Sequence, residues 1–189
     1  FAAVAPAAFG AFAQAPQPPE IAARTYMLVD VTANQVLAAK DIDAPVEQVM
    51  RGPIDYLTLD YLAEVTMSIL QKQKGRDPQA GYARDFVEMI DRVLPELAAK
   101  NIRVVANAGG LNPLACRAAV LAAAARHGLA VKVAAIVGDD ITGRLDQMLA
   151  DGLEFRNMDT GAPLTSVRSL VRSANAYLGA FPIAQALDN

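Results

Sequence analysis

The first half of the chain alternates between apolar and polar residues in ways that predict strands and helices in turn. Tyr26 to Val31 and Val36 to Ala39 are strand-like runs around a short turn, which predicts a β-hairpin. Ile54 to Asp60 alternates as a strand does, and Tyr61 to Leu70 has apolar residues at helical spacing. The charged stretch from Lys72 to Gly81 contains Gly and Pro and predicts a loop.

The middle of the chain carries a strand between two helices. Tyr82 to Lys100 is amphipathic, and Pro95 within it predicts a kink or a break into two helices. Ile102 to Ala106 is an apolar run typical of a buried strand. Asn112 is suited to cap the next helix, and Pro113 is suited to its first position. That helix is expected to run to His127, with Gly128 closing it.

The last third continues the alternation less clearly. Val131 to Val137 predicts another apolar strand, and Asp139 is expected to cap a helix from Ile141 to Ala150. A further helix is expected within Leu164 to Leu178 and a short one over Pro182 to Leu187. The order predicts an α/β fold: an incomplete parallel, Rossmann-like sheet flanked by helices, with an N-terminal β-hairpin appendage.

The composition excludes several classes of ligand and of functional site. The chain has 189 residues, a net charge of -3 and 53% hydrophobic residues. It has no basic excess, so nucleic-acid binding is not expected. One cysteine, Cys116, and one histidine, His127, do not supply a disulfide, a multi-cysteine metal site or a two-histidine zinc motif. No apolar run is long enough to cross a bilayer.

The first 48 residues have a different character from the rest. Residues 1–19 are rich in Ala, Pro and Gln and are expected to be a signal-peptide remnant and linker, with Ala11-Phe12-Ala13 as a cleavage site. The alternative is a disordered tail. Residues 20–48 form the hairpin segment, and residues 49–189 the α/β domain.

The hairpin segment resembles a known N-terminus. The run PPEIAARTYMLVDVTANQVLAAKDIDAPVE, within residues 1–47, resembles the start of a D-alanyl-D-alanine carboxypeptidase, a penicillin-binding protein. That family continues into Ser-x-x-Lys, which supplies the nucleophile and its lysine partner. No Ser-x-x-Lys occurs in this chain, so peptidase activity is not expected.

Two strand ends offer candidate binding residues. Ligands gather at the carboxyl ends of parallel strands. At the first end the turn after Ala106 offers backbone N–H groups and a helix N-terminus, which suit a phosphate or carboxylate. The alternative is that its glycines only permit a tight turn. The candidates there are Asn107, Gly109, Gly110 and Asn112.

Four acidic residues are further candidates. Asp139 and Asp140 follow the next predicted strand and could hold a cation or a ribose, or simply cap a helix. Asp60 and Glu64 are spaced one helical turn apart and are weak candidates for acid–base work. They could equally be a solvated pair. Cys116 is interpreted as a small buried residue of the core, and His127 as a cap that complements the dipole at the helix C-terminus.

Residues 54–189 carry a second resemblance. DYLTLDYLAEVTMSIL, NIRVVANAGGLNP and KVAAIVGDD, in this order, resemble the acyclic terpene utilisation family, AtuA. The resemblance implies a role in bacterial catabolism of citronellol- and geraniol-type terpenes. It also implies a branched acyl-CoA ligand and acyl-CoA carboxylase-type partners. Coenzyme A contains a pyrophosphate, so the resemblance favours a ligand role for the glycine turn.

The two resemblances together imply a composite chain. Our first hypothesis is a partial AtuA-like domain that handles a branched acyl-CoA and is inactive alone, with oligomers forming through an open sheet edge. The alternatives are an exported carboxypeptidase relative without its catalytic motif, and a non-enzymatic scaffold subunit of a carboxylase system. The AtuA-like body implies a cytoplasmic location, whereas the signal remnant would imply export.

Overall fold

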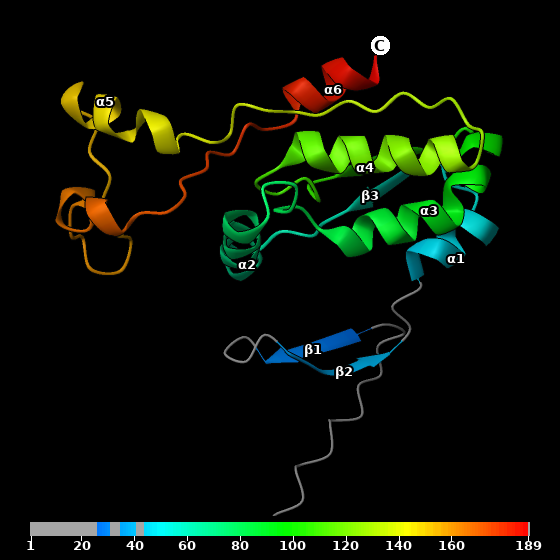
Figure 1. Ribbon diagram of the computed structural model, residues 1–189, viewed down its shortest axis with the longest axis horizontal. Coiled ribbons are helices and arrows are strands. Elements are labelled where there is room, and N and C mark those ends of the chain that lie inside the picture. The colour runs from blue at the N-terminus through cyan, green and yellow to red at the C-terminus, as the bar shows by residue number, and fades with distance from the viewer. Residues whose placement is uncertain (1–25, 31–34, 41–43, 189) are drawn as a thin grey trace, which may run out of the picture. The chain divides into compact units, whose positions relative to one another are not determined.

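The computed structural model describes residues 26–30, 35–40 and 44–188. The chain divides into two compact units, residues 1–44 and 45–189, and each is described by itself (Figure 1). The expected signal remnant and cleavage site, together with residues 20–25, lie outside the described residues.

The first unit contains the predicted hairpin. β1 (Tyr26–Asp30) pairs antiparallel with β2 (Gln35–Lys40), and the register shifts between Leu28 and Val29. The strand positions agree with the sequence prediction to within one residue. Tyr26, Val29 and Val36 are of the residue types that favour strands.

The second unit is built on a two-stranded parallel sheet. β3 (Tyr56–Leu59) pairs with β4 (Arg103–Ala106), and Leu57 lies opposite Val104. The connection between the strands contains α2 (Glu64–Arg76) and α3 (Arg84–Ala99). Parallel strands need such a helical crossover. The α/β class and the incomplete parallel sheet are therefore confirmed.

The core lies between this sheet and two helices. α3 and α4 (Pro113–Arg126) run side by side (Figure 1). α3 turns a stripe of apolar residues toward the core, and α4 contributes small ones. The buried cluster includes Leu57, Phe86, Ile90, Val93, Leu94, Leu97, Ile102, Cys116, Val120, Ala123 and Ala124. The alanines let the two helices approach closely.

A short helix that the sequence pattern did not indicate precedes the sheet. α1 (Ala44–Arg51) buries Val49 completely in the same core. The ammonium group of Lys100 donates to the carbonyl oxygens of Val49 and Met50, at 2.9 Å and 2.8 Å. A cation at the C-terminal carbonyls of a helix complements the helix dipole.

Two predicted boundaries are wrong in α2 and α3. α2 begins at Glu64 and continues to Arg76, so it takes in the first half of the stretch from Lys72 to Gly81 that is predicted as a loop, and the loop itself begins at Asp77. Lys and Gln are good helix formers, and their propensity outweighs the single Gly75. α3 continues through Pro95 as one helix, so the predicted break does not occur. The apolar stripe on both sides of Pro95 is anchored in the core.

The prediction for α4 is confirmed at both ends. The side chain of Asn112 accepts from the backbone N–H of Ala115, and Pro113 occupies the first turn. The helix ends at Arg126, and Gly128 follows with φ +67°. These are local cap signals, which sequence alone can show.

The predicted strand over Val131 to Val137 is absent from the structure. Val131 and Val133 pack against the core, and the guanidinium of Arg117 on α4 donates to the carbonyl of Val133 at 2.7 Å. Residues 131–134 alternate between partly buried and exposed positions, as the residues of a strand often do. A strand also needs a neighbouring backbone to pair with, and no described residue pairs with this segment.

The remaining described residues, 138–188, form a loosely packed arm. A 3₁₀ turn, η1 (Thr142–Arg144), leads into α5 (Leu145–Ala150), and Asp140 rather than Asp139 accepts the N–H of Thr142. Instead of a helix over 164–178 there are two 3₁₀ turns, η2 (Leu164–Ser166) and η3 (Arg168–Leu170). The last helix, α6 (Phe181–Leu187), is confirmed.

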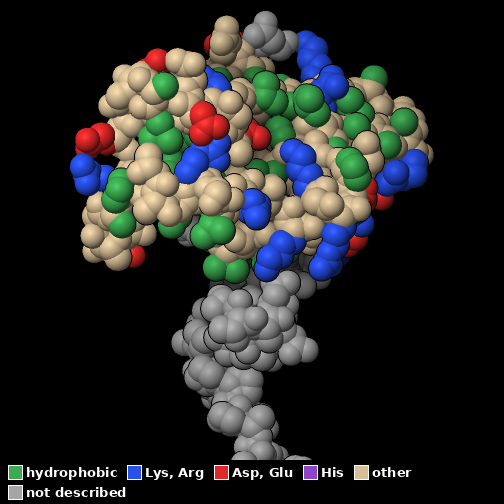
Figure 2. All heavy atoms as spheres, turned by 60° about the vertical axis from the view of Figure 1, so that its left-hand side comes forward, with side chains coloured by type: hydrophobic (Ala, Val, Ile, Leu, Met, Phe, Trp, Pro, Cys, Tyr) green, Lys and Arg blue, Asp and Glu red, His purple; other side chains and the backbone are tan. Residues whose placement is uncertain are grey.

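The arm has almost no core of its own. Leu145 is the only buried residue described from position 145 onward. Met158, Tyr177 and Phe181 are almost fully exposed. Figure 2 shows apolar side chains on the surface among basic and acidic ones. Without a core that fixes local geometry, the helical pattern around residue 170 does not produce a helix.

We predict that the α3–α4 core dominates stability. Leu97→Ala should lower the free energy of unfolding by about 2–5 kcal/mol, because it leaves a cavity at a residue that is 5% exposed. Leu114→Ala is the control, at a leucine that is 64% exposed, and should change it by about 0.5 kcal/mol or less. Urea denaturation measures both. Equal effects would mean that this cluster is not the core.

Candidate functional site

The glycine turn, Asn107 to Asn112, connects β4 to α4 at the carboxyl end of the strand. Its backbone donors are used within the protein. Gly110 N–H donates to Asn107, Leu111 N–H to Gly81 and Asn112 N–H to Gly109, at 3.2, 2.9 and 2.9 Å. The sequence-based premise that these N–H groups are free for an anion is therefore wrong for Gly110, Leu111 and Asn112.

Asn107 joins the turn to the end of β3. Its amide oxygen accepts the backbone N–H of Tyr61 at 2.7 Å, and its amide nitrogen donates to the Asp60 carboxylate at 2.6 Å. The Asn107 hydrogen bond, with a second from the N–H of Leu62, holds the pKa of Asp60 below its usual value. The side chain of Asn107 is committed to holding two strand ends together.

Asn112 joins the turn to the loop between α2 and α3. Its amide nitrogen donates to the carbonyl oxygens of Pro78 and Ala80, both at 2.9 Å, while its oxygen caps α4. The N–H of Ala83 donates to the carbonyl oxygen of Ala108, so a seam of hydrogen bonds joins the turn to the loop from Asp77 to Ala83. Asn112 therefore uses both donors and its acceptor inside the protein.

The two glycines are required by close packing. A Cβ on Gly109 would lie 2.9 Å from Pro113 Cα. Gly110 has φ +51°, and a Cβ there would lie 2.9 Å from the carbonyl oxygen of Gly81 and collide with the buried side chain of Leu70. Residues with a side chain rarely adopt that φ, and Leu70 and Gly81 already occupy the space that a Cβ would need. Gly110 thus lets the turn pack against α2 and the loop after it, and Gly109 lets it pack against the start of α4.

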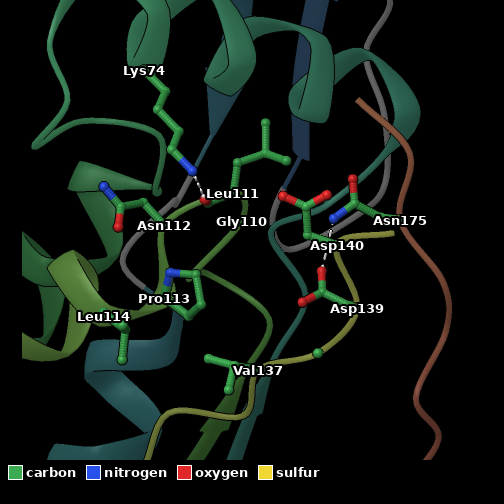
Figure 3. Close-up of a pocket in the computed structure, with 11 residues that line it drawn as sticks. Lys74, Gly110, Leu111, Asn112, Pro113, Leu114, Val137, Asp139, Asp140 and Asn175 are labelled. Atoms are coloured by element: carbon green, nitrogen blue, oxygen red, sulfur yellow. Dashed lines mark hydrogen bonds between the residues drawn. The ribbon is translucent and has the colours of Figure 1, made fainter. Parts of the chain in front are cut away.

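A pocket of about 200 Å³ opens beside this turn (Figure 3). One wall comes from α2, the turn and the start of α4, and includes Lys74, Gly110, Asn112 and Leu114. The other wall consists of Val137 and four residues of the arm, Gly138, Asp139, Asp140 and Asn175. The two predicted strand-end segments therefore face each other across one pocket.

Lys74 is the cation of the pocket. Its ammonium group donates to the carbonyl oxygen of Leu111 at 2.6 Å. An ammonium group has three donors, so two remain beyond this bond. A Cβ on Gly81 would lie 3.0–3.3 Å from the Lys74 stem, so Gly81 gives the stem room to lie flat. Lys74 is thus held in place by its stem and by one hydrogen bond.

The acidic side is held by the arm itself. Asn175 donates to one oxygen of Asp139 at 2.8 Å, and one oxygen of Asp140 accepts the N–H of Thr142 at 2.9 Å. The backbones of Asp140 and Asn175 form an isolated antiparallel bridge. Each carboxylate has a second oxygen for which no partner is found among the described residues.

The sequence candidates separate into two groups. Gly110, Asn112, Asp139 and Asp140 contribute to the pocket lining. Asn107, Gly109 and Asp60 lie outside that lining. Glu64 begins α2, and its side chain is outside the described residues.

Sequence reasoning missed three contributors. The sequence pattern predicts a loop at Lys74 and indicates no binding role for Asn175 or Val137. Lys74 could have been found from helix propensity, which extends α2 to its position. Asn175 could not, because its partner Asp139 is 36 residues away in the sequence.

Cys116 and His127 have the structural roles expected of them, and His127 has a partner in addition. Burial raises the pKa of the Cys116 thiol to about 11, so the thiol stays protonated at neutral pH. His127 caps α4 and contacts Asp91 at 2.9 Å, next to an Arg126–Asp91 ion pair of the same length. Arg126 and His127 hold the pKa of Asp91 below its usual value.

The described residues contain no cluster of three or more His, Cys, Asp or Glu that could hold a metal ion. Among them, too, no helix is long and apolar enough to span a membrane.

Comparison with known proteins settles the family. The family model for "Acyclic terpene utilisation family protein AtuA" matches residues 29–189, most of the chain. The chain belongs to the AtuA family. No curated protein and no solved structure matches.

The AtuA match also bears on the N-terminal segment. It begins at residue 29, within the hairpin and about 20 residues before the expected start of the AtuA-like part. The comparisons give no support to the penicillin-binding-protein resemblance of residues 1–47. The AtuA match accounts for residues 29–47 as family sequence.

We predict that Gly110 is needed for packing as well as for its backbone angle. Gly110→Ala should destabilise the protein by clearly more than Gly128→Ala, measured by urea denaturation. Both glycines have positive φ, which costs an alanine roughly 1 kcal/mol. Only Gly110 has neighbours in the way of a Cβ, since nothing lies within 4 Å of one on Gly128. Equal losses would contradict the tight seating of the turn.

We predict a pH-dependent contribution from Asp60. Its pKa is lower in the folded protein, so its stabilisation is present above the unfolded pKa of about 3.9 and is lost as pH falls through the folded pKa. Asp60→Asn should therefore lower the melting temperature at pH 7, and the difference from wild type should shrink toward pH 3. Thermal melts across this range test it. A difference independent of pH would contradict it.

Proposed function

We propose that this AtuA-family chain binds an acyl-CoA thioester in the pocket between the glycine turn and the arm. The family association with acyclic terpene utilisation points to branched, apolar chains. Such chains are commonly degraded as coenzyme A thioesters. The location we propose is the cytoplasm, where acyl-CoA is made and consumed.

The observation that carries this proposal is the mixed lining of the pocket. Ligand pockets combine an apolar surface with a few convergent polar groups. Here Pro113, Leu114 and Val137 supply apolar surface beside the ammonium group of Lys74 and the oxygens of Asp139 and Asp140. An acyl-CoA has the matching parts: a phosphorylated, hydrogen-bonding carrier and an apolar chain.

We propose binding rather than turnover for this chain. Asp139 and Asp140 each hold a structural hydrogen bond in the arm. Cys116 is buried and protonated, so it is a poor nucleophile. These groups suit recognition, and the bound thioester would be presented to a carboxylase-type partner.

We predict that coenzyme A raises the melting temperature of the chain. A ligand that binds only the folded state stabilises it by mass action, by about 1.4 kcal/mol at ten times its dissociation constant. Leu114→Glu should abolish the shift, because it puts bulk and negative charge on an exposed pocket residue. Thermal melts with and without millimolar coenzyme A measure this.

Ala122→Glu is the matched control. It introduces the same side chain on the same helix, at an exposed residue outside the pocket, and should keep the shift. If wild type shows no shift, or if both variants lose it equally, the pocket does not bind coenzyme A.

A further inference from the structure

The charge of the pocket opposes a pyrophosphate. Lys74 contributes one positive charge, while Asp139 and Asp140 contribute two negative ones. The glycine turn does not compensate, because the N–H groups of Gly110, Leu111 and Asn112 are bonded within the protein. Pyrophosphate sites instead use free backbone N–H groups that converge on the anion. The adenosine diphosphate end of coenzyme A therefore fits this pocket poorly.

The hydrogen-bonding pattern favours a neutral ligand rich in donors. Asp139 and Asp140 each use one carboxylate oxygen in the arm and have a second, for which the described part of the chain offers no partner. Ionised carboxylates only accept hydrogen bonds. A ligand facing them must bring N–H or O–H groups, as amides and hydroxyl groups do.

Size and apolar surface narrow the choice further. The pocket, at about 200 Å³, is smaller than the 300–1,000 Å³ typical of sites for drug-sized ligands, so it holds one part of coenzyme A. Pro113, Leu114 and Val137 form an apolar surface beside the acidic groups (Figure 3). The pantetheine arm is slim and combines a hydroxyl group and two amide N–H groups with a dimethyl-substituted carbon.

We infer that the pocket binds the neutral pantetheine part of the thioester, with its hydroxyl and amide donors at Asp139 and Asp140. The pyrophosphate then stays outside the pocket, and only the phosphate next to pantetheine meets the two remaining donors of Lys74 at the rim. The adenine nucleotide then extends outside the pocket. This inference rests on the proposed function and assigns which end of the ligand it recognises.

Competition between coenzyme A fragments tests the assignment. A fluorescent coenzyme A conjugate is bound to the full chain and displaced with pantetheine, 4′-phosphopantetheine or adenosine 3′,5′-diphosphate. We expect 4′-phosphopantetheine to compete within about tenfold of coenzyme A. Pantetheine should compete more weakly, and adenosine 3′,5′-diphosphate should not compete at millimolar concentration.

Two methionine variants identify the phosphate contact. Lys74→Met keeps the apolar stem but removes the charge, and should weaken 4′-phosphopantetheine about tenfold while leaving pantetheine unchanged. Lys72→Met is the control, at an exposed lysine of the same helix outside the pocket lining, and should change neither affinity.

The outcomes separate the two proposals. Competition by adenosine 3′,5′-diphosphate, without competition by pantetheine, would overturn the assignment and leave coenzyme A binding intact. If Lys74→Met weakened the binding of pantetheine and of 4′-phosphopantetheine equally, the placement of the phosphate at Lys74 would also be overturned. Failure of the conjugate to bind at all would overturn the proposed function as well.

Discussion

The hydrogen-bonded seam between the glycine turn and the loop from Asp77 to Ala83 is the constraint on which the second unit depends. Asn112 donates to Pro78 and Ala80, Leu111 donates to Gly81, and Ala83 donates to Ala108. These bonds tie the segment after β4 to the crossover that precedes α3. The seam fixes where α2 ends relative to where α4 begins. It therefore also fixes where Lys74 meets the pocket.

The features predicted correctly from sequence are those with local causes. Asn112-Pro113 and Gly128 mark the ends of α4 because caps act within a few residues. The alternation of apolar and polar residues predicts β3, and a short apolar run predicts β4. The strand expected over Val131 to Val137 has an apolar run like that of β4, but no described residue pairs with its backbone. The pattern reports burial, whereas pairing depends on residues elsewhere in the chain.

The candidate site shows the same division. The sequence indicated residues of both walls from the rule that ligands gather where parallel strands end, although only the turn after β4 follows a strand in the structure. It could not show which donors were already used. Asn107 and Asn112 have the side chains of ligand-binding residues, yet their hydrogen-bonding groups are used by partners at least 32 residues away or, for the Asn112 oxygen, by its own helix. Long-range hydrogen bonds decide such cases, and no local signal reveals them.

The same seam explains why the pocket favours donors over anions. To seat Gly110 against Leu70 and Gly81, the turn directs its N–H groups inward. The N–H groups that could attract an anion are thereby hydrogen-bonded within the protein, and Lys74 is the only positively charged one among the described residues that line the pocket. Across the pocket, Asp139 accepts a hydrogen bond from Asn175, and Asp140 accepts one from the N–H of Thr142. A turn that looks like an anion site in sequence thus forms, through packing, one wall of the site that we propose for hydroxyl and amide groups.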